Sequence, residues 1–413
     1  MGKTWLVREL GRQFSSYVEV NLEESPELMI YFQEHRGEPQ KLIQKLQASL
    51  NKKITLKETL LFIDEIQECP DAILSLRYFK EKMPDLHVIA AGSLIEFALN
   101  EISFPVGRVD FMHVFPMNFT EYLQAANLES FAEIIQDQPI ALDQLIHEKI
   151  MNEFKTYTLL GGLPEVISTY LEEKDLGQAQ SIQQSLVANY RSDFAKYASK
   201  AQVNYIKSVF DSIPRQLGGK FIFAKASSES KSRDLNTGLQ LLQDAQLAYK
   251  CHHSSGNSLP LGAEINESKF KVYFVDTGLC HRILGLQLNQ QFLNEFIQFG
   301  GICENVVVQE IFAKTPPNTE PLIYYWHREE KSSGAEVDLL LDRQGEILPI
   351  EVKRGSGGRR KSLSLFCEEK KAKVAYMVAD HPFEVGSINN RKTKLITLPY
   401  YYSSSLMESL TEK

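Results

Sequence analysis

The 413-residue sequence lacks a long apolar run, a cysteine framework and an excess of positive charge. No stretch approaches the ~20 apolar residues that a membrane-spanning helix needs, so we expect no membrane association. The five cysteines are scattered and odd in number, which argues against a disulfide framework and for a reducing, cytoplasmic environment. The formal net charge of −8 offers no general basic coat for non-specific DNA binding, although it does not preclude a local basic patch.

Apolar and charged residues are present in ordinary globular proportions, 43% and 24%, so the chain is not mostly disordered. Its length suggests two or three domains. Continuous apolar runs at 60–63 and 86–91 alternate with helical segments at 40–50 and 72–82. Such runs are typical of strands buried in a parallel sheet, so the N-terminal part is predicted to be α/β.

The pattern changes along the middle of the chain. Residues 118–200 carry Leu, Ile and Tyr at helical spacing, punctuated by Gly-Gly-Leu-Pro at 161–164. Residues 204–253 form a shorter helical module, in which 233–245 resembles the second half of a helix-turn-helix followed by a strand. Two interpretations stay open: a winged-helix contact to DNA, and a packing module between two domains, which we favour.

The first residues have the chemistry of a phosphate-binding loop. Gly2-Lys3-Thr4 matches the end of G-x-x-x-x-G-K-[ST], in which backbone N–H groups and the lysine contact phosphates and the hydroxyl ligates Mg²⁺. The tripeptide alone is weak evidence. The apolar run 60–63 ends in Asp64 and Glu65, at the edge where α/β sheets bind ligands. Asp64 can hold Mg²⁺ through water, and Glu65 can orient or deprotonate an attacking water.

Two more side chains extend this set. Ser93 follows the next apolar run and can sense a γ-phosphate, and Arg108 can supply a cation to the developing phosphoryl charge. Each has a plainer interpretation, because strand-end Asp and Ser residues also cap helices and an isolated Arg is usually solvated. As an ordered set, these residues predict a P-loop NTPase domain by descent, with ATP and Mg²⁺ as its cofactors.

A second group of charged residues lies in the C-terminal part. Apolar runs at 336–341 and 347–353, joined by a Gly-containing turn, predict a β-hairpin. Side chains alternate along a strand, so Glu351 and Lys353 point the same way, and Asp338 on the partner strand can join them. An Asp followed by Glu-x-Lys is the pattern of PD-(D/E)xK nucleases, in which carboxylates hold Mg²⁺ and the lysine orients a water.

Glu304, which precedes an apolar helix, can add a further carboxylate and a metal ligand beside Asp338 and Glu351. The alternative is a surface hairpin in which the glutamate and lysine simply form a cross-strand pair. We favour the nuclease-like fold without the catalysis, in which the lysine rather than a metal neutralises the carboxylates.

The ordered blocks resemble the prokaryotic AAA-type ATPases that carry a C-terminal domain of unknown function similar to restriction endonucleases. The resemblance covers nearly the whole chain, in the family's order, through GKT, LLFIDEIQ, AAGSL, GRV, FPMNFTEYL, GGLPE, YFVDTGL and IEVK. It implies that Lys3 and Thr4 are phosphate-loop residues, that Asp64 and Glu65 serve Mg²⁺ and water, and that Ser93 senses the γ-phosphate. Arg108 matches a family arginine whose role stays open.

We therefore expect an α/β chain of four segments: a parallel-sheet P-loop ATPase core (1–125), a helical segment (126–203), a winged-helix-like module (204–260) and a restriction-endonuclease-like α/β domain (261–413). The leading function is ATP binding and hydrolysis of the AAA type, coupled to the C-terminal domain. One alternative is a Mg²⁺-dependent nuclease or DNA-binding protein with a vestigial ATPase. Another is a non-catalytic interaction protein.

The resemblance also has a gap. Family members have a strand and the first half of the phosphate loop before Gly-Lys-Thr, whereas this sequence starts at Met1. We therefore expect a truncated chain, or a mis-assigned start, and weak or absent ATP binding by the chain as written.

Overall fold

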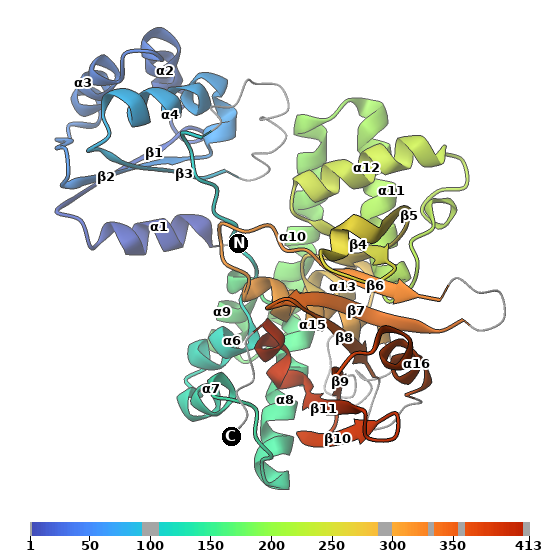
Figure 1. Cartoon of the computed structure of the whole chain (residues 1–413). Coiled ribbons are helices and arrows are strands. Elements are labelled where there is room, and N and C mark those ends of the chain that lie inside the picture. Colours follow the sequence, from blue (N-terminus) through green and yellow to red (C-terminus); the bar gives the residue numbers. More distant parts are fainter. Residues whose placement is uncertain (1, 93–106, 288–299, 329–333, 354–359, 408–413) are drawn as a thin grey trace. The chain divides into compact units, whose positions relative to one another are not determined.

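The computed structural model describes residues 2–92, 107–287, 300–328, 334–353 and 360–407 (Figure 1). The described chain is an α/β protein, as the sequence predicts. It divides into two compact units. One comprises Gly2–Val114 together with Asp244–Gln246, and the other comprises Phe115–Gln243 and Leu247–Lys413. Each unit is described by itself.

The first unit is built on a three-stranded parallel sheet in the order β1-β2-β3. Helix α1 lies on one face of this sheet, and helices α2, α3 and α4 lie on the other (Figure 1). The bounds are α1 (Lys3–Gly11), β1 (Ser16–Asn21), η1 (Pro26–Leu28), α2 (Met29–His35), α3 (Pro39–Leu50), β2 (Thr59–Asp64), η2 (Ile66–Glu68), α4 (Pro70–Lys82) and β3 (His87–Ala90).

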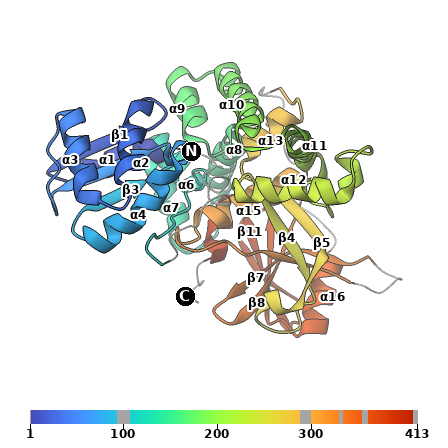
Figure 2. The same ribbon diagram turned by 90° about the horizontal axis from the view of Figure 1, so that it is seen from above.

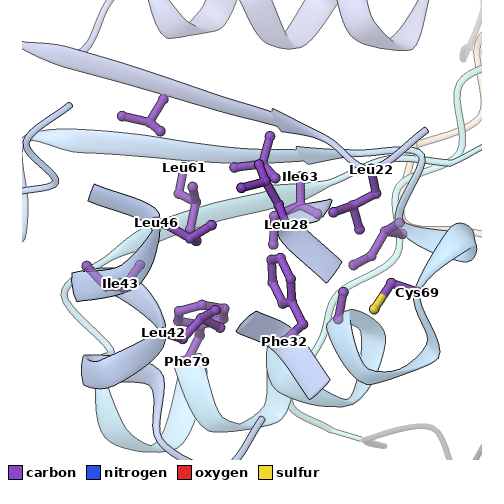
Figure 3. Packing of buried hydrophobic residues seen from close by; sticks show 14 of the residues in the cluster. Leu22, Leu28, Phe32, Leu42, Ile43, Leu46, Leu61, Ile63, Cys69 and Phe79 are labelled. Atoms are coloured by element: carbon purple, nitrogen blue, oxygen red, sulfur yellow. The ribbon is translucent and has the colours of Figure 1, made fainter. Parts of the chain in front are cut away.

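Strand β2 is buried along its whole length, because both faces of the sheet are covered. Leu61 and Ile63 point to the face that carries α2, α3 and α4, where they join Phe32 and Leu42 (Figure 3). The alternate side chains Leu60 and Phe62 belong to the opposite cluster, with Val7 of α1. A strand buried on both faces reads as a continuous apolar run, which is why the sequence marks it clearly.

The second unit begins with a helical part, as the sequence predicts. Its helices are α6 (Phe119–Ala125), α7 (Glu129–Gln136), α8 (Gln144–Leu160), α9 (Pro164–Glu173), α10 (Leu176–Tyr197), α11 (Lys200–Gln216), η3 (Phe223–Lys225) and α12 (Ser232–Asp244). Helix α6 starts at a capping box, in which the Asn118 side chain accepts from the Glu121 amide and the Glu121 carboxylate accepts from the Asn118 amide.

The rest of the unit is a mixed eight-stranded sheet in the order β10-β11-β9-β8-β7-β6-β4-β5, with helix α16 packed against β7, β8 and β9. The strands are β4 (Ala248–Ser254), β5 (Ile265–Phe274), β6 (Tyr324–His327), β7 (Glu336–Arg343), β8 (Glu346–Val352), β9 (Val374–Ala379), β10 (Glu384–Ile388) and β11 (Thr393–Pro399). The remaining elements are η4 (Leu261–Glu264), α13 (Thr277–Ile283), α15 (Gly300–Ala313), α16 (Lys361–Lys370) and η6 (Tyr400–Met407).

The segment that resembles a winged helix contributes to this large sheet. Strands β4 and β5 form an antiparallel hairpin behind α11 and α12, and β4 also pairs in parallel with β6 (Figure 2). The hairpin is therefore continuous with the eight-stranded sheet, and DNA contact by this segment stays a prediction. Among the described residues, no helix is long and apolar enough to cross a membrane.

Candidate nucleotide site and C-terminal carboxylate cluster

Helix α1 starts directly after a glycine in a left-handed conformation. Gly2 caps the helix with φ 76° and ψ 10°, a left-handed conformation that glycine adopts without a steric cost. Its carbonyl accepts the first helical hydrogen bond, from the Leu6 amide at 3.0 Å. Lys3 and Thr4 form the first turn of α1, at the positive end of the helix dipole. This end of a helix favours a nearby anion.

Thr4 and Asp64 are joined directly. The Thr4 hydroxyl donates to Asp64 Oδ2 at 2.9 Å, and the Glu65 amide donates to Asp64 Oδ1 at 3.1 Å. Asp64 is the last residue of β2 and only 4% exposed. Burial raises the pKa of this carboxyl, the Thr4 hydrogen bond opposes the rise, and the neighbouring Glu65 charge adds to it. A cation beside Asp64 would therefore be stabilising.

Lys3 and Glu65 lie around the same strand end. The Lys3 ammonium donates to the Gly92 carbonyl, directly after β3. Glu65 has φ 50°, also left-handed, and its carboxylate accepts from Gln67 Nε2 at 2.6 Å. The sequence analysis missed Gln67, although it belongs to the same Asp-Glu-Ile-Gln block. A Cβ at Gly92 would lie 2.1 Å from Gln67 Oε1, so a side chain at position 92 would displace this amide.

Two sequence-predicted residues, Ser93 and Arg108, remain to be considered. Ser93 lies outside the described residues. Arg108 forms an ion pair with Glu81 of α4, with 3.2 Å between Arg108 Nε and Glu81 Oε1, and its side chain is 45% exposed. A role for either residue at a nucleotide stays a prediction.

The C-terminal carboxylates surround a lysine that the sequence analysis did not single out. The Lys271 side chain of β5 is 0% exposed. Its ammonium lies 2.6 Å from Glu336 Oε1, 3.2 Å from Glu304 Oε2 and 3.6 Å from Asp338 Oδ1. Burial lowers the pKa of Lys271, but the three carboxylates outweigh it and hold that pKa well above its usual value. The three carboxylates therefore favour the charged form of Lys271.

The predicted residues Glu304 and Asp338 are both held in place by hydrogen bonds. Glu304, on α15, also accepts from the Tyr273 hydroxyl at 3.0 Å. Asp338, on β7, accepts from the Val352 amide at 2.8 Å. Burial and the nearby Asp338 charge raise the pKa of Glu304 to about 8, against the effect of Lys271.

Glu351 and Lys353 lie next to this cluster and pair with each other. The Lys353 ammonium donates to Glu351 Oε1, and the Glu351 carboxylate is 7% exposed. Burial and Asp338 raise the pKa of Glu351 to about 7, against the effect of Lys353. Burial thus raises the pKa of both Glu304 and Glu351, while the neighbouring lysines favour the ionised form of each carboxyl. Within the described ranges, no group of three or more His, Cys, Asp and Glu side chains is arranged to hold a metal ion.

Two further buried carboxylates join distant segments of the second unit. Asp276, which starts α13, accepts from the Gly162 amide at 2.7 Å and the Leu279 amide at 3.0 Å. Glu310 of α15 accepts from the Phe119 amide at 2.9 Å and the Tyr157 hydroxyl at 2.7 Å. These contacts connect sequence blocks that lie more than a hundred residues apart, so both carboxylates have a structural role.

A parallel sheet with helices on both faces, a helix that starts at Gly-Lys-Thr and a strand-end aspartate bonded to that threonine define an α/β domain. Residues 1–123 match the model of an AAA domain family. Residues 151–290 and 299–401 match two domains of unknown function, DUF8612 and DUF4143. The N-terminal part of the chain is thus similar to AAA domains, and two domains of unknown function follow it.

Curated relatives share only part of the chain. An uncharacterized protein of Mycobacterium bovis and one of Mycobacterium tuberculosis are each 34% identical to it over 86 residues, which is 21% of this chain and 18% of the relative. The chain therefore aligns with less than a fifth of the length of these relatives. No solved structure matches it significantly.

Proposed function

We propose that this protein binds and hydrolyses ATP with Mg²⁺ at the N-terminal sheet edge, contrary to the weak or absent binding expected from its sequence alone. Lys3 contacts the phosphates, Thr4 and Asp64 ligate Mg²⁺, and Glu65 activates the attacking water. The observation that carries the proposal is the 2.9 Å contact between the Thr4 hydroxyl and Asp64 Oδ2. It joins a helix start with a strand end that is sixty residues away.

The donor set fits the metal and the phosphates. A hydroxyl and a carboxylate oxygen are the hard ligands that Mg²⁺ prefers, and burial of Asp64 adds to the benefit of a nearby cation. When bound, Mg²⁺ would neutralise charge on the transferred phosphoryl group. Lys3, one residue before the ligand Thr4, adds a second positive charge at the same helix end.

Glu65 has the position of a water-orienting group. Its left-handed backbone turns the chain directly after the strand, and Gln67 Nε2 holds the carboxylate at 2.6 Å. A carboxylate fixed in this way can accept a proton from water only while it stays ionised. Glutamine at position 65 has nearly the same shape but cannot accept that proton, so Glu65→Gln separates ATP binding from ATP hydrolysis. Ser93 and Arg108 are proposed to contact the γ-phosphate and the developing charge, as the family resemblance implies.

The test is a titration of labelled ATP into the protein with and without Mg²⁺, combined with phosphate release. Lys3→Ala should lower ATP affinity by roughly 10- to 100-fold, because one charge-assisted contact is lost. Glu65→Gln should leave affinity unchanged and stop phosphate release. Lys41→Ala is the matched control, because Lys41 is an exposed lysine of α3 that pairs with Glu38. Wild-type affinity in Lys3→Ala, or wild-type turnover in Glu65→Gln, would contradict the proposal.

The C-terminal carboxylates offered a nuclease as the alternative function. The described contacts of this cluster favour an internal lysine over a metal as its cation, so nuclease activity is not proposed as a second function.

A further inference from the structure

The Lys271 ammonium lies where three carboxylates from two elements converge. Glu304 comes from α15, and Glu336 and Asp338 come from β7, at 3.2, 2.6 and 3.6 Å from Lys271 Nζ. The Tyr325 ring adds a fourth contact, with its centroid 5.4 Å from the same nitrogen. We propose that Lys271 is the resident cation of this cluster and takes the place that a divalent metal ion would need.

The cluster has no room for both a metal ion and the Lys271 ammonium. Mg²⁺ binds carboxylate oxygens at about 2.0–2.1 Å, and Mn²⁺ uses similar oxygen ligands. A metal shared by Glu304, Glu336 and Asp338 would have to lie at their meeting point. Lys271 Nζ already lies there, within 3.6 Å of one oxygen of each of the three carboxylates. An ammonium and a divalent cation at the same point would repel each other strongly inside the protein.

The second step concerns the oxygens that remain. Asp338 Oδ2 accepts from the Val352 amide, and Glu304 Oε2 accepts from the Tyr273 hydroxyl as well as from Lys271. Glu351 Oε1 accepts from Lys353. Hydrogen-bond donors of the protein therefore hold Asp338 Oδ2, Glu304 Oε2 and Glu351 Oε1, and a metal ion at these three oxygens would have to displace them. Glu351 Oε2 is buried and has no hydrogen-bond partner among the described residues.

The third step is that Lys271 is fixed by its strand. Tyr273 lies two residues further on β5 and therefore on the same face, where both side chains contact Glu304. Strand β5 is buried on this stretch and pairs with β4 along seven residues of register. A lysine with a 0% exposed side chain cannot leave this position without uncovering the three carboxylates.

The experiment counts bound Mn²⁺ by electron paramagnetic resonance in the full chain without nucleotide. Asp64→Asn serves as the parent, so that the proposed N-terminal Mg²⁺ site does not contribute. The parent should bind no Mn²⁺ at the C-terminal cluster. Adding Lys271→Met should create one Mn²⁺ site at the cluster. The affinity of the cluster for Mn²⁺ should rise by about a hundred-fold or more relative to the parent, because one positive charge at ~4 Å is removed. Adding Lys353→Met instead should create none, because Lys353 contacts Glu351 alone among the four acidic side chains.

One result overturns the proposal without depending on whether the Lys271 variant folds. If the parent binds Mn²⁺ and Glu351→Gln or Asp338→Asn removes that binding, a metal rather than Lys271 is the cation of the cluster. A folded Lys271→Met variant with no gain in Mn²⁺ affinity also contradicts it. Neither outcome bears on ATP, because the Asp64→Asn parent leaves the ATP titration as a separate measurement on the wild-type chain.

Discussion

Replacing Glu310 by glutamine should change how the stability of the second unit depends on pH. Glu310 is 1% exposed, and burial raises the pKa of its carboxyl to about 7. Hydrogen bonds from Tyr157 and Phe119 oppose the rise, and the Glu121 charge adds to it, while Lys314 acts against it. The folded protein therefore keeps a proton at Glu310 that an unfolded glutamate, with its ordinary pKa of 4.5, releases.

The sign follows from where the proton is held. Below pH 4.5 both states are protonated and the contribution of the group to stability is complete; between pH 4.5 and about 7 only the folded state holds the proton. The free energy of unfolding therefore falls as pH rises through this window. The slope is at most ~1.4 kcal/mol per pH unit, which gives a total loss of about 3 kcal/mol by pH 7 to 8.

Glu310→Gln should remove this slope. The glutamine side chain keeps an oxygen that can accept from Phe119 and Tyr157, but it does not titrate. Urea denaturation, followed by fluorescence of the buried Trp326 in a Trp5→Phe background, should give similar stability to the wild type near pH 4.5. The variant should be the more stable by about 3 kcal/mol at pH 8. Glu346→Gln, at the exposed start of β8, is the control and should follow the wild-type curve. Parallel curves for wild type and Glu310→Gln would refute the assignment of a buried proton to Glu310.

Two further predictions concern the contact between α13 and the segment before α9. Asp276→Ala should lower the free energy of unfolding by about 3 kcal/mol, because the buried Gly162 and Leu279 amides lose their acceptor; a loss below ~1 kcal/mol in urea denaturation would contradict this. Gly162→Ala should cost about 2 kcal/mol or more, because its Cβ would lie 2.3 Å from the Met117 carbonyl oxygen, and a melting temperature equal to wild type would show that this backbone can shift freely.

The central strand of the N-terminal sheet could be predicted from the sequence because it is covered on both faces. The run at 60–63 corresponds to β2 (Thr59–Asp64), and the helical segments at 40–50 and 72–82 correspond to α3 and α4. The helical middle and the later mixed sheet were also foreseen. These elements can be predicted from the periodicity of their apolar residues, which depends only on local burial.

Two strands of the large sheet were missed for physical reasons. Strand β10 (Glu384–Ile388) is exposed along most of its length and lies at the edge of the sheet, so it has no apolar pattern. Strand β6 (Tyr324–His327) is only four residues long and shows an irregular register against β7. Strand β10 pairs with β11, the next strand along the chain, so its exposure rather than a distant partner hides it. Strand β6 pairs with β7 and also with β4, which is distant in sequence and which no local window contains.

The nearness of Asp338 to Glu351 followed from the hairpin, because β7 and β8 pair with Leu339 opposite Ile350. Lys271 could not be placed by the same reasoning. It reaches Asp338 from β5, and β6 and β4 lie between β5 and β7 in the sheet order. The only local signal was a lysine inside the apolar stretch Phe-Lys-Val-Tyr-Phe at 270–274. A lysine on a buried strand face requires carboxylate partners, but not particular ones.

The two sites start from the same local signal, an aspartate on a strand of a sheet, and differ in what else contacts it. The described hydrogen bonds of Asp64 come from the Thr4 hydroxyl and the Glu65 amide, which are dipoles without net charge. Asp338, in contrast, lies beside a charged group, because Lys271 Nζ is 3.6 Å from Asp338 Oδ1. A buried carboxylate needs a cation, and a side chain that supplies one leaves less electrostatic reason to recruit a metal. The contacts therefore support the proposal that Mg²⁺, brought by ATP, binds in the N-terminal domain rather than at the C-terminal cluster.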